Sequence, residues 1–492
     1  MPSAKPSSAA FSLRRALALT LAIILILPHT LASTEAKASV FNFGIKDEKE
    51  LGEKFNILIR SQLTMVDDAE VVDYMRDLIA RLDKVTPPHP FPFYVSVVKD
   101  NSINAFAAPA GYVFVFTGLL LSMEHECEVA GVMAHEMTHV IQRHIAKRIE
   151  QGTMMNIAAL AGVLAGFVLG SVAHQQNAGV AMMAGSQAAA TQAMLNYSRE
   201  DEREADEVGM NFLIAAGYPP RGLPQAMEIL NHMRIFQGSG TIPPYLATHP
   251  YITERVAYLS ERVKRLPKDV QARVDHDERF FRVQMILRSR YGVPETAMAY
   301  YEKKGSAMTK LDRLGLAVAL GRTTDNAGAK QAFDKALAEG NDDSLWLREA
   351  GRFYLKIRDF DRARSLLQRA VDKNPGDMVA TYEYAGILAQ DGNYPLAMSL
   401  MAKVVQHTSD APEIYAQYGR ICGQAGDLFH AYLNLAYAGI YSNTPRQARF
   451  QVDKARNAAK TEQQHREFDK MESLYRERSE YWPKNMFGGT MD

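Results

Sequence analysis

The chain has 492 residues, of which 47% are hydrophobic and 23% are charged, an ordinary composition for a globular protein with roughly two to four domains. Basic and acidic residues both number 56, so the charge balance gives no signal for nucleic-acid binding. Only Cys127 and Cys422 are available, which excludes a disulfide framework and a cysteine-based metal site. We interpret them as buried thiols, with one long-range bridge as the alternative.

Residues 1–38 have the pattern of a secretory signal peptide. Arg14 and Arg15 precede an apolar run at 16–27, and the sequence at 36–38 fits a small-x-small cleavage site. Because the apolar run is short for a membrane span, an uncleaved anchor is the alternative rather than the main interpretation. The pattern therefore predicts a secreted protein.

Two helical patterns, at 47–60 and 68–84, come before two β-rich runs at 93–98 and 112–116. A strand directly ahead of a metal-binding helix is able to hold an extended substrate by main-chain pairing, and a plain sheet strand is the alternative. The residues expected in the substrate strand are Tyr112, Val113, Phe114, Val115 and Phe116.

A His-Glu-x-x-His pattern lies inside an apolar run that predicts a buried helix at about 125–150. His135 and His139 are four residues apart, so they share one face of that helix. This spacing allows two imidazoles to bind one Zn²⁺, with Glu136 as general base for the attacking water. A core helix with two satisfied histidines is the alternative. His144 is expected to face elsewhere and not to bind the metal.

Residues 153–195 are rich in alanine, glycine and methionine. The part at 153–173 is almost wholly apolar and long enough to span a membrane. Metal ligands are predicted on both sides of the segment, which excludes a single crossing, and the polar residues of 174–195 disfavour a second one. We expect a mobile or membrane-touching helical hairpin over the active site, with peripheral membrane contact through 153–173. A buried pair of core helices and an integral-membrane protease are the alternatives.

An acidic helix start near residue 200 supplies candidates for a third ligand. A catalytic zinc needs three protein ligands and one open position. Glu202 offers a carboxylate ligand, and Asp206, one turn later, offers an acceptor for a spare imidazole N–H. Composition alone does not select Glu202 over Glu200 or Glu204, and an exposed charged helix start is the alternative.

These motifs together resemble the HtpX and prenyl-protein-protease family of gluzincins. The resemblance rests on the stretches at 135–139, 104–107 and 202–206 together with the strand at 112–116, and it covers about residues 45–265. Members of the HtpX type have clear transmembrane helices, whereas this chain has at most one candidate, the apolar run within 153–195. It is therefore more similar to the secreted, BepA-type branch, which implies a periplasmic location, possible contact with a membrane surface and quality control of outer-membrane proteins.

The resemblance implies one Zn²⁺ held by His135, His139 and Glu202, with Asp206 behind the ligands. Thr248-His249-Pro250 and Arg255 also match the BepA-type branch. His249 is expected to be either a fourth metal contact that displaces the water and keeps the enzyme latent, or a donor to the oxyanion, and a loop histidine that caps the next helix is the alternative. Arg255 is expected to support the site, with a structural salt bridge as the alternative.

From about residue 310 the chain repeats with a period of 34 residues. Alanine recurs at this period at positions 329, 363, 397 and 431, and the clearest unit spans 346–375. This period is typical of tetratricopeptide repeats and predicts an α-solenoid whose concave face binds peptides or protein partners. A purely structural scaffold is the alternative.

The sequence therefore predicts a mostly α protein. A signal peptide (1–38) precedes a zincin-like α+β metalloprotease domain with a small β-sheet (45–265) and an α-solenoid of tetratricopeptide repeats (270–480). The expected function is a zinc endopeptidase that acts on envelope proteins, above all those of the outer membrane, with repeats that recruit substrates or the outer-membrane assembly machinery. The alternative is a chaperone or assembly-binding module with a latent metal site.

Overall fold

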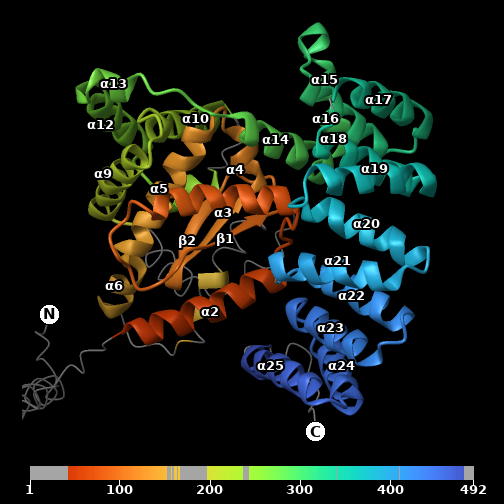
Figure 1. Cartoon of the computed structure of the whole chain (residues 1–492). Helices are drawn as coiled ribbons and strands as arrows, with labels where there is room; N and C mark the ends of the chain where they lie inside the picture. Colours follow the sequence, from red (N-terminus) through yellow and green to blue (C-terminus); the bar gives the residue numbers. More distant parts are fainter. Residues whose placement is uncertain are drawn as a thin grey trace, which may run out of the picture. The chain divides into compact units, whose positions relative to one another are not determined.

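The computed structural model describes residues 43–151, 197–236, 243–340, 342–408 and 410–480, together with a few single positions (157, 160–162, 164–166 and 482). These residues belong to one compact unit that begins at Phe43 (Figure 1). The predictions for the signal peptide, and almost all of those for 153–195, concern residues outside this set. Among the described residues, no helix has both the length and the apolar content that a membrane crossing requires.

A three-stranded sheet forms the centre of the N-terminal part. It consists of β1 (Tyr94–Val98), β2 (Ala105–Ala108) and β3 (Tyr112–Phe116), in the order β1-β3-β2. β3 is parallel to β1 and antiparallel to β2. Val97, Val113 and Val115 belong to the buried core, and the rings of Phe106 and Phe114 stack with their centroids 5.0 Å apart. The small β-sheet predicted from the sequence is thus confirmed.

This topology corrects the expected substrate strand. All five residues of β3, Tyr112 to Phe116, pair with β1, and residues 112–115 pair with β2 on the other side. Both edges of β3 are therefore occupied, and its main chain is not available to a substrate. Within the described residues, β1 and β2 are the two edge strands of this sheet, and β2 is the one that packs against α5.

Helices surround the sheet and complete the N-terminal part. They are α2 (Ile45–Gln62), α3 (Ala69–Asp83), η1 (Pro109–Gly111), α4 (Thr117–Ser122), α5 (Glu126–Ile141), α6 (His144–Gln151), α9 (Arg199–Ala215), α10 (Gly222–Phe236), α11 (Pro244–Thr248), α12 (Ile252–Arg265) and α13 (Lys268–Gln271). The helix predicted at about 125–150 is in fact two helices, because Arg143 adopts a left-handed conformation (φ 53°) between α5 and α6.

The central helix α5 packs against α9, α10 and β2. Residues 127–140 of this helix are all buried. Small residues allow its neighbours to come close, since a Cβ atom on Gly209 of α9 would lie 3.1 Å from the backbone of Ala134 and His135. Cys127 and Cys422 are both buried and unpaired, which confirms their interpretation as buried thiols.

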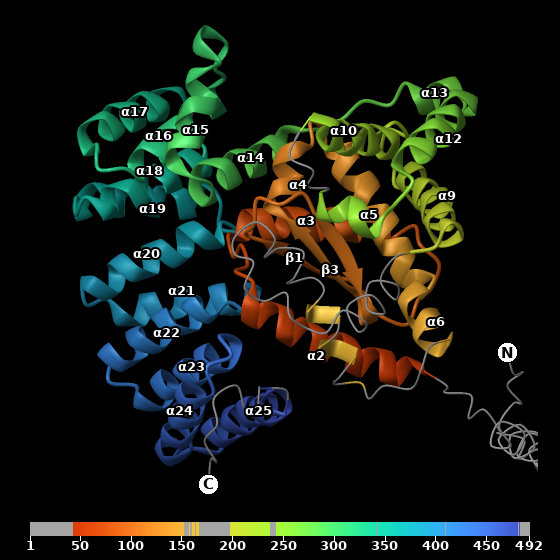
Figure 2. The same cartoon turned by 180° about the vertical axis from the view of Figure 1, so that it is seen from behind.

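The C-terminal part is a series of antiparallel helix pairs (Figure 2). It comprises α14 (Glu278–Ile286), η2 (Leu287–Tyr291), α15 (Pro294–Glu302), η3 (Gly305–Ala307), α16 (Lys310–Gly321), α17 (Asn326–Glu339), α18 (Ser344–Lys356), α19 (Phe360–Lys373), α20 (Met378–Gln390), α21 (Tyr394–His407), α22 (Pro412–Gln424), α23 (Leu428–Tyr441), α24 (Pro445–Ala458) and α25 (Glu462–Ser479). The four periodic alanines lie on the second helix of successive pairs, where each is buried. The predicted repeat architecture is confirmed.

Several contacts connect the repeats to the N-terminal part, among them the ion pair between His407 and Asp73 and the two sets that follow. The segment before α14 caps the first turn of α5, where Asp277 Oδ1 accepts the Glu126 N–H at 2.8 Å. In the second set, the guanidinium of Arg348 on α18 is 1% exposed and lies 3.1 Å from Glu70 of α3 and 3.2 Å from Asp377. A buried cation of this kind is stable only when carboxylates surround it.

Candidate metal centre

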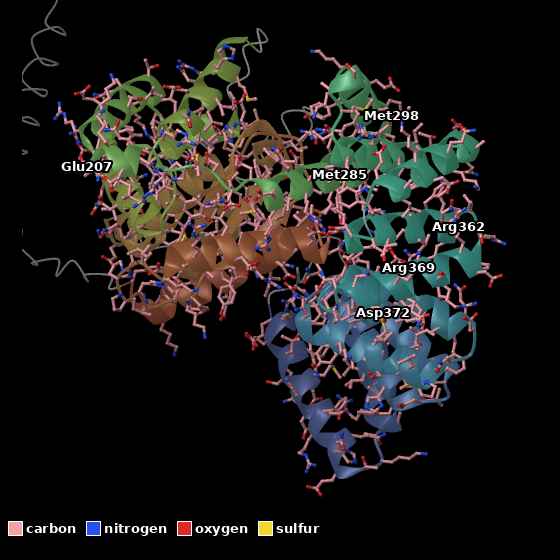
Figure 3. The ribbon with its side chains drawn as sticks, turned by 45° about the horizontal axis from the view of Figure 1, so that its top comes forward. Glu207, Met285, Met298, Arg362, Arg369 and Asp372 are labelled. Carbon is pink, nitrogen blue, oxygen red and sulfur yellow. The ribbon has the colours of Figure 1, made fainter. Side chains whose placement is uncertain are left out.

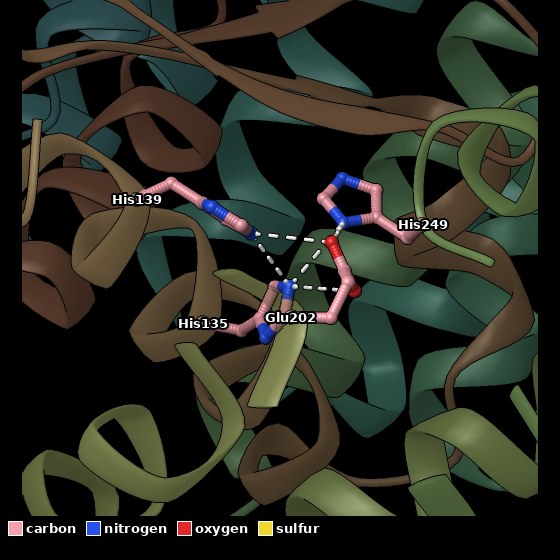
Figure 4. Close-up of side chains that lie close together, drawn as sticks. All are labelled: His135, His139, Glu202 and His249. Atoms are coloured by element: carbon pink, nitrogen blue, oxygen red, sulfur yellow. Dashed lines mark hydrogen bonds and ion pairs between the residues drawn. The ribbon is translucent and has the colours of Figure 1, made fainter. Parts of the chain in front are cut away.

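Two histidines of α5 point their Nε2 atoms at a common point. His135 Nε2 and His139 Nε2 lie 3.0 Å apart, and both side chains are almost completely buried (Figure 4). Their spacing of one helical turn produces this arrangement directly, as the sequence predicts.

Helix α9 adds a carboxylate from the opposite side. Glu202 Oε2 is 3.7 Å from His135 Nε2, and Glu202 Oε1 is 3.6 Å from His139 Nε2. Glu202 is 2% exposed, whereas Glu200 and Glu204 are exposed to solvent. Of the three glutamates at this helix start, it is Glu202 that is buried beside His135 and His139.

A third imidazole completes the group. His249 follows α11, and its Nδ1 atom lies 2.8 Å from Glu202 Oε1 and 3.3 Å from His135 Nε2. The ring of Tyr245 stacks on it, with centroids 4.5 Å apart. His249 is therefore part of the buried group and does not cap the next helix, α12, whose N-cap residue is Tyr251.

The four side chains, His135, His139, Glu202 and His249, fit a divalent metal ion. In a tetrahedral zinc site with bonds of about 2.0–2.1 Å, ligand atoms lie about 3.3–3.4 Å from each other. The measured separations, from 2.8 to 3.7 Å, are distributed around this value. Imidazole lone pairs that converge in a dry interior repel one another unless a cation lies between them. The donor set, three nitrogens and one carboxylate, is one that zinc prefers.

Asp206 lies behind His135 on the side away from the metal position. Its Oδ1 atom is 2.9 Å from His135 Nδ1. The Asp206 carboxylate also accepts two hydrogen bonds from Arg255, one from Nε to Oδ2 at 2.8 Å and one from Nη2 to Oδ1 at 2.7 Å. Burial alone would raise the pKa of Asp206, but Arg255 and His135 hold it well below its usual range. The Asp206 carboxylate therefore accepts the Nδ1–H of His135 and leaves the Nε2 lone pair for a metal.

Arg255 has two partners in the site. Besides Asp206, its Nη1 forms an ion pair with Glu202 Oε2, and the side chain is 2% exposed. The two interpretations of Arg255 from the sequence are thus compatible, because its salt bridges hold both the candidate ligand Glu202 and the residue behind His135.

Glu136 is completely buried beside the metal ligands. Its Oε2 atom accepts the backbone N–H of Ala107 in β2 at 3.0 Å, and its Oε1 atom is 3.5 Å from His249 Nε2. Burial raises the pKa of Glu136 to about 7. A carboxyl group with this pKa is able to take up and release a proton near neutral pH.

His144 is a neighbour of the site that the sequence pattern places wrongly. It was expected to face elsewhere, because it is five residues beyond His139 and a continuous helix was predicted there. The left-handed Arg143 turns the chain, and His144 Nδ1 lies 2.8 Å from His139 Nδ1. His144 Nε2 is in turn 3.2 Å from Glu204.

Tyr197 is a second neighbour that no sequence signal indicates. Its ring stacks on His139 with centroids 3.7 Å apart, and the side chain is 9% exposed. Contacts of this kind depend on how distant segments fold together, which spacing along the sequence does not reveal.

Comparison with known proteins identifies both parts of the chain. Residues 66–263 match the model of peptidase family M48, and residues 314–377 and 348–412 match that of the tetratricopeptide repeat. The chain is 33% identical to the putative beta-barrel assembly-enhancing protease of Vibrio cholerae over 223 residues, and this matched region covers 45% of each chain. It is 30% identical to the beta-barrel assembly-enhancing protease of Escherichia coli K12 over 233 residues, and this matched region covers 47% of each chain.

A more distant similarity links the chain to eukaryotic proteins. It is 35% identical over 167 residues to the mitochondrial metalloendopeptidase OMA1 of Arabidopsis thaliana, which covers 34% of this chain and 31% of that one. For both bacterial relatives, the matched region spans less than half of the relative's length.

Proposed function

We propose that the protein is a zinc-dependent endopeptidase that cleaves proteins of the cell envelope, since residues 66–263 match the model of peptidase family M48 and tetratricopeptide repeats follow them. The observation that carries the proposal is the buried convergence of His135, His139 and Glu202 beside Glu136. Ligand atoms of three imidazoles and one carboxylate all lie within 4.8 Å of one another there, and this donor set suits a zinc ion.

In this proposal His135, His139 and Glu202 hold the zinc. When bound, zinc supplies a Lewis acid that polarises the scissile carbonyl and makes water acidic enough to react near pH 7. Glu136 accepts the proton of the attacking water and delivers it to the leaving amine. The Ala107 N–H holds the Glu136 carboxylate in place, and Asp206 keeps His135 in the tautomer that has a free Nε2 lone pair.

We propose that the substrate main chain pairs with the edge strand β2 (Ala105–Ala108) rather than with β3. Ala107 contacts Glu136 directly, so a peptide laid along β2 would bring its carbonyl groups close to the general base. An extended peptide gains main-chain hydrogen bonds at such an edge irrespective of its sequence.

We propose further that His249 fills the fourth metal position at rest. Its Nδ1 atom lies 3.3 Å from His135 Nε2 and 2.8 Å from Glu202 Oε1, among the other ligand atoms, as a fourth ligand requires. A site with four protein ligands has no open position for water. The enzyme would then be latent until His249 moves away.

The relatives' names associate them with beta-barrel assembly, and we propose by analogy a periplasmic location and outer-membrane proteins as substrates. The repeats would recruit these substrates or the assembly machinery. The filled fourth position also supports a second candidate function, a chaperone or assembly-binding module whose metal site is latent.

The substitution Glu136→Gln separates the two functions. It keeps the volume and the hydrogen bond to Ala107 but removes the proton acceptor, so cleavage of an unfolded envelope protein should fall by about 10²–10⁴-fold while zinc content is unchanged. If a strain that carries this variant retains full envelope integrity, the protein acts as a binding module there.

A further inference from the structure

The repeats contain a cavity of about 450 Å³ that is distant in sequence from the metal centre. Residues from η2, α16, α17, α18 and α20 line it, together with Arg322 after the end of α16 and Phe360 at the start of α19. A cavity of this size accommodates one or two amino-acid side chains.

The carboxylates in the cavity wall already have cationic partners. Glu349 is paired with Arg290, Arg348 and Arg352, and Glu383 lies 2.9 Å from Arg352. These groups therefore have little capacity to attract a further cation.

Two cations in the same wall are not neutralised in this way. Arg322 Nη1 donates to the carbonyl oxygens of Ser289 and Gly292 at 2.9 and 2.6 Å. Lys356 Nζ donates to those of Gly321 and Thr323, both at 2.7 Å. In the described part of the chain, neither Arg322 nor Lys356 has a carboxylate within ion-pair distance.

The two cations are also adjacent. Lys356 binds the carbonyl groups on either side of Arg322 in the sequence, so both charges belong to the same turn. Burial and the nearby Arg290 lower the pKa of the Arg322 guanidinium by more than the Glu295 carboxylate raises it.

Other arginines of the repeats show the usual arrangement. Arg362 and Arg369 of α19, labelled in Figure 3, form ion pairs with Asp334 and Asp342 respectively. At Arg322 and Lys356, backbone carbonyl groups take the place of such carboxylates.

An apolar surface lies beside the two cations. Phe333 and Phe353 stack with ring centroids 4.8 Å apart, and the ring of Phe360 is 40% exposed. The cavity thus combines an apolar wall with positive charge that lacks a counterion, a combination that favours a ligand with both an apolar group and an anion.

We infer that this cavity binds an extended peptide segment through one carboxylate, held by Arg322 and Lys356, and an aromatic or aliphatic side chain next to it, held by the phenylalanine wall. The inference rests on the proposed role of the repeats in recruitment and specifies the chemistry of what they recruit. The carboxylate is that of an acidic side chain or of a chain terminus.

Fluorescence anisotropy with the full-length Glu136→Gln protein tests the inference without cleavage. The probes are labelled peptides that end in phenylalanine with a free carboxylate, the same peptide amidated, and amidated peptides with an internal Glu-Phe or Gln-Phe pair. We expect the carboxylate-bearing peptides to bind at least roughly tenfold more tightly than their neutral counterparts, and less tightly at high salt. Comparison of the free-acid and the internal Glu-Phe peptides distinguishes the two sources.

Substitutions in the cavity complete the test. The double variant Arg322→Gln/Lys356→Gln should lose roughly tenfold or more in affinity, whereas Arg322→Lys/Lys356→Arg, which keeps both charges, should stay within about threefold. Lys335→Gln, an exposed position of α17 outside the cavity, should have no effect. Equal binding of neutral and anionic peptides, no binding of any peptide, or unchanged binding by the glutamine variant would overturn the inference. Because binding is measured without proteolysis, these outcomes are independent of whether the protein is a protease.

Discussion

His144 Nδ1 lies 2.8 Å from Nδ1 of His139, and both imidazoles are 2% exposed. If His139 binds a metal through Nε2, its Nδ1–H donates to His144, whose Nε2–H then donates to Glu204. His144 thus holds His139 in place from behind, as Asp206 does for His135. A candidate metal ligand on each side of the site has its own orienting partner.

Replacement of His144 should therefore weaken metal binding more than it weakens folding. We expect His144→Phe to reduce zinc affinity by about 10–100-fold, since the ring is retained but the acceptor for the His139 N–H is lost. Competition with a chromophoric chelator measures this affinity. His465→Phe, at an exposed position of α25, is the control and should leave it unchanged.

The close contact between α5 and α9 gives a second prediction. A methyl group at Gly209 would lie 3.1 Å from the Ala134 backbone, so Gly209→Ala should push α9 away from α5 and carry Glu202 with it. We expect a loss of about 1–3 kcal/mol in the free energy of unfolding, together with weaker zinc binding.

Urea denaturation and chelator competition measure these two effects. Gly423→Ala is the matched control, because the nearest atom to its added Cβ would be that of Ala431 at 3.7 Å. This helical position should be neutral or slightly stabilised. Equal effects at the two glycines would contradict the contact.

Substitution of His249 distinguishes its two possible roles. If His249 occupies the fourth position at rest in about nine-tenths of molecules, His249→Ala should raise the cleavage rate by roughly tenfold. If it instead donates to the oxyanion, the same change should lower the rate by about 10²–10³-fold. Initial rates on a quenched peptide, normalised to bound zinc, give the direction.

The ion network around Glu349 predicts how stability depends on pH. Burial raises the pKa of this carboxyl, but Arg290, Arg352 and Arg348 outweigh burial and lower the value from 4.5 to about 2. Because the folded-state pKa is depressed, the stabilisation is fully present above about pH 4.5. It is lost progressively as the pH falls towards 2.

This contribution is on the order of 3 kcal/mol. Unfolding monitored by circular dichroism between pH 6 and pH 3 measures it. Glu349→Gln should be less stable at pH 6, because it leaves the arginines without their shared partner, and its stability should fall less steeply with acid. A variant with the same pH profile as the wild type would show that Glu349 does not have this role.

The sequence predicts those features that depend on local periodicity. One helical turn separates His135 from His139, and a period of 34 residues produces the stacked helix pairs, so both follow from spacing alone. Glu202 required the family resemblance, because three glutamates at the same helix start are equivalent in composition. Of the three glutamates only Glu202 is buried, which agrees with its choice as the candidate ligand.

The features that the sequence does not predict depend on tertiary structure. The position of His144 depends on the left-handed conformation of Arg143, a residue type that does not indicate such a turn. The order β1-β3-β2 places the most strand-like run in the middle of the sheet and the weaker Ala105–Ala108 at its edge. The network around Arg348 joins it to Asp68, which lies 280 positions earlier in the sequence.

A crystal structure of the purified protein with anomalous scattering measured at the zinc edge tests the metal centre most directly. One anomalous peak should lie within about 2.0–2.2 Å of His135 Nε2, His139 Nε2 and a Glu202 oxygen, with His249 as the fourth ligand. A zinc-replete crystal with no peak among these residues, or with the peak at another site, would contradict the proposed enzyme.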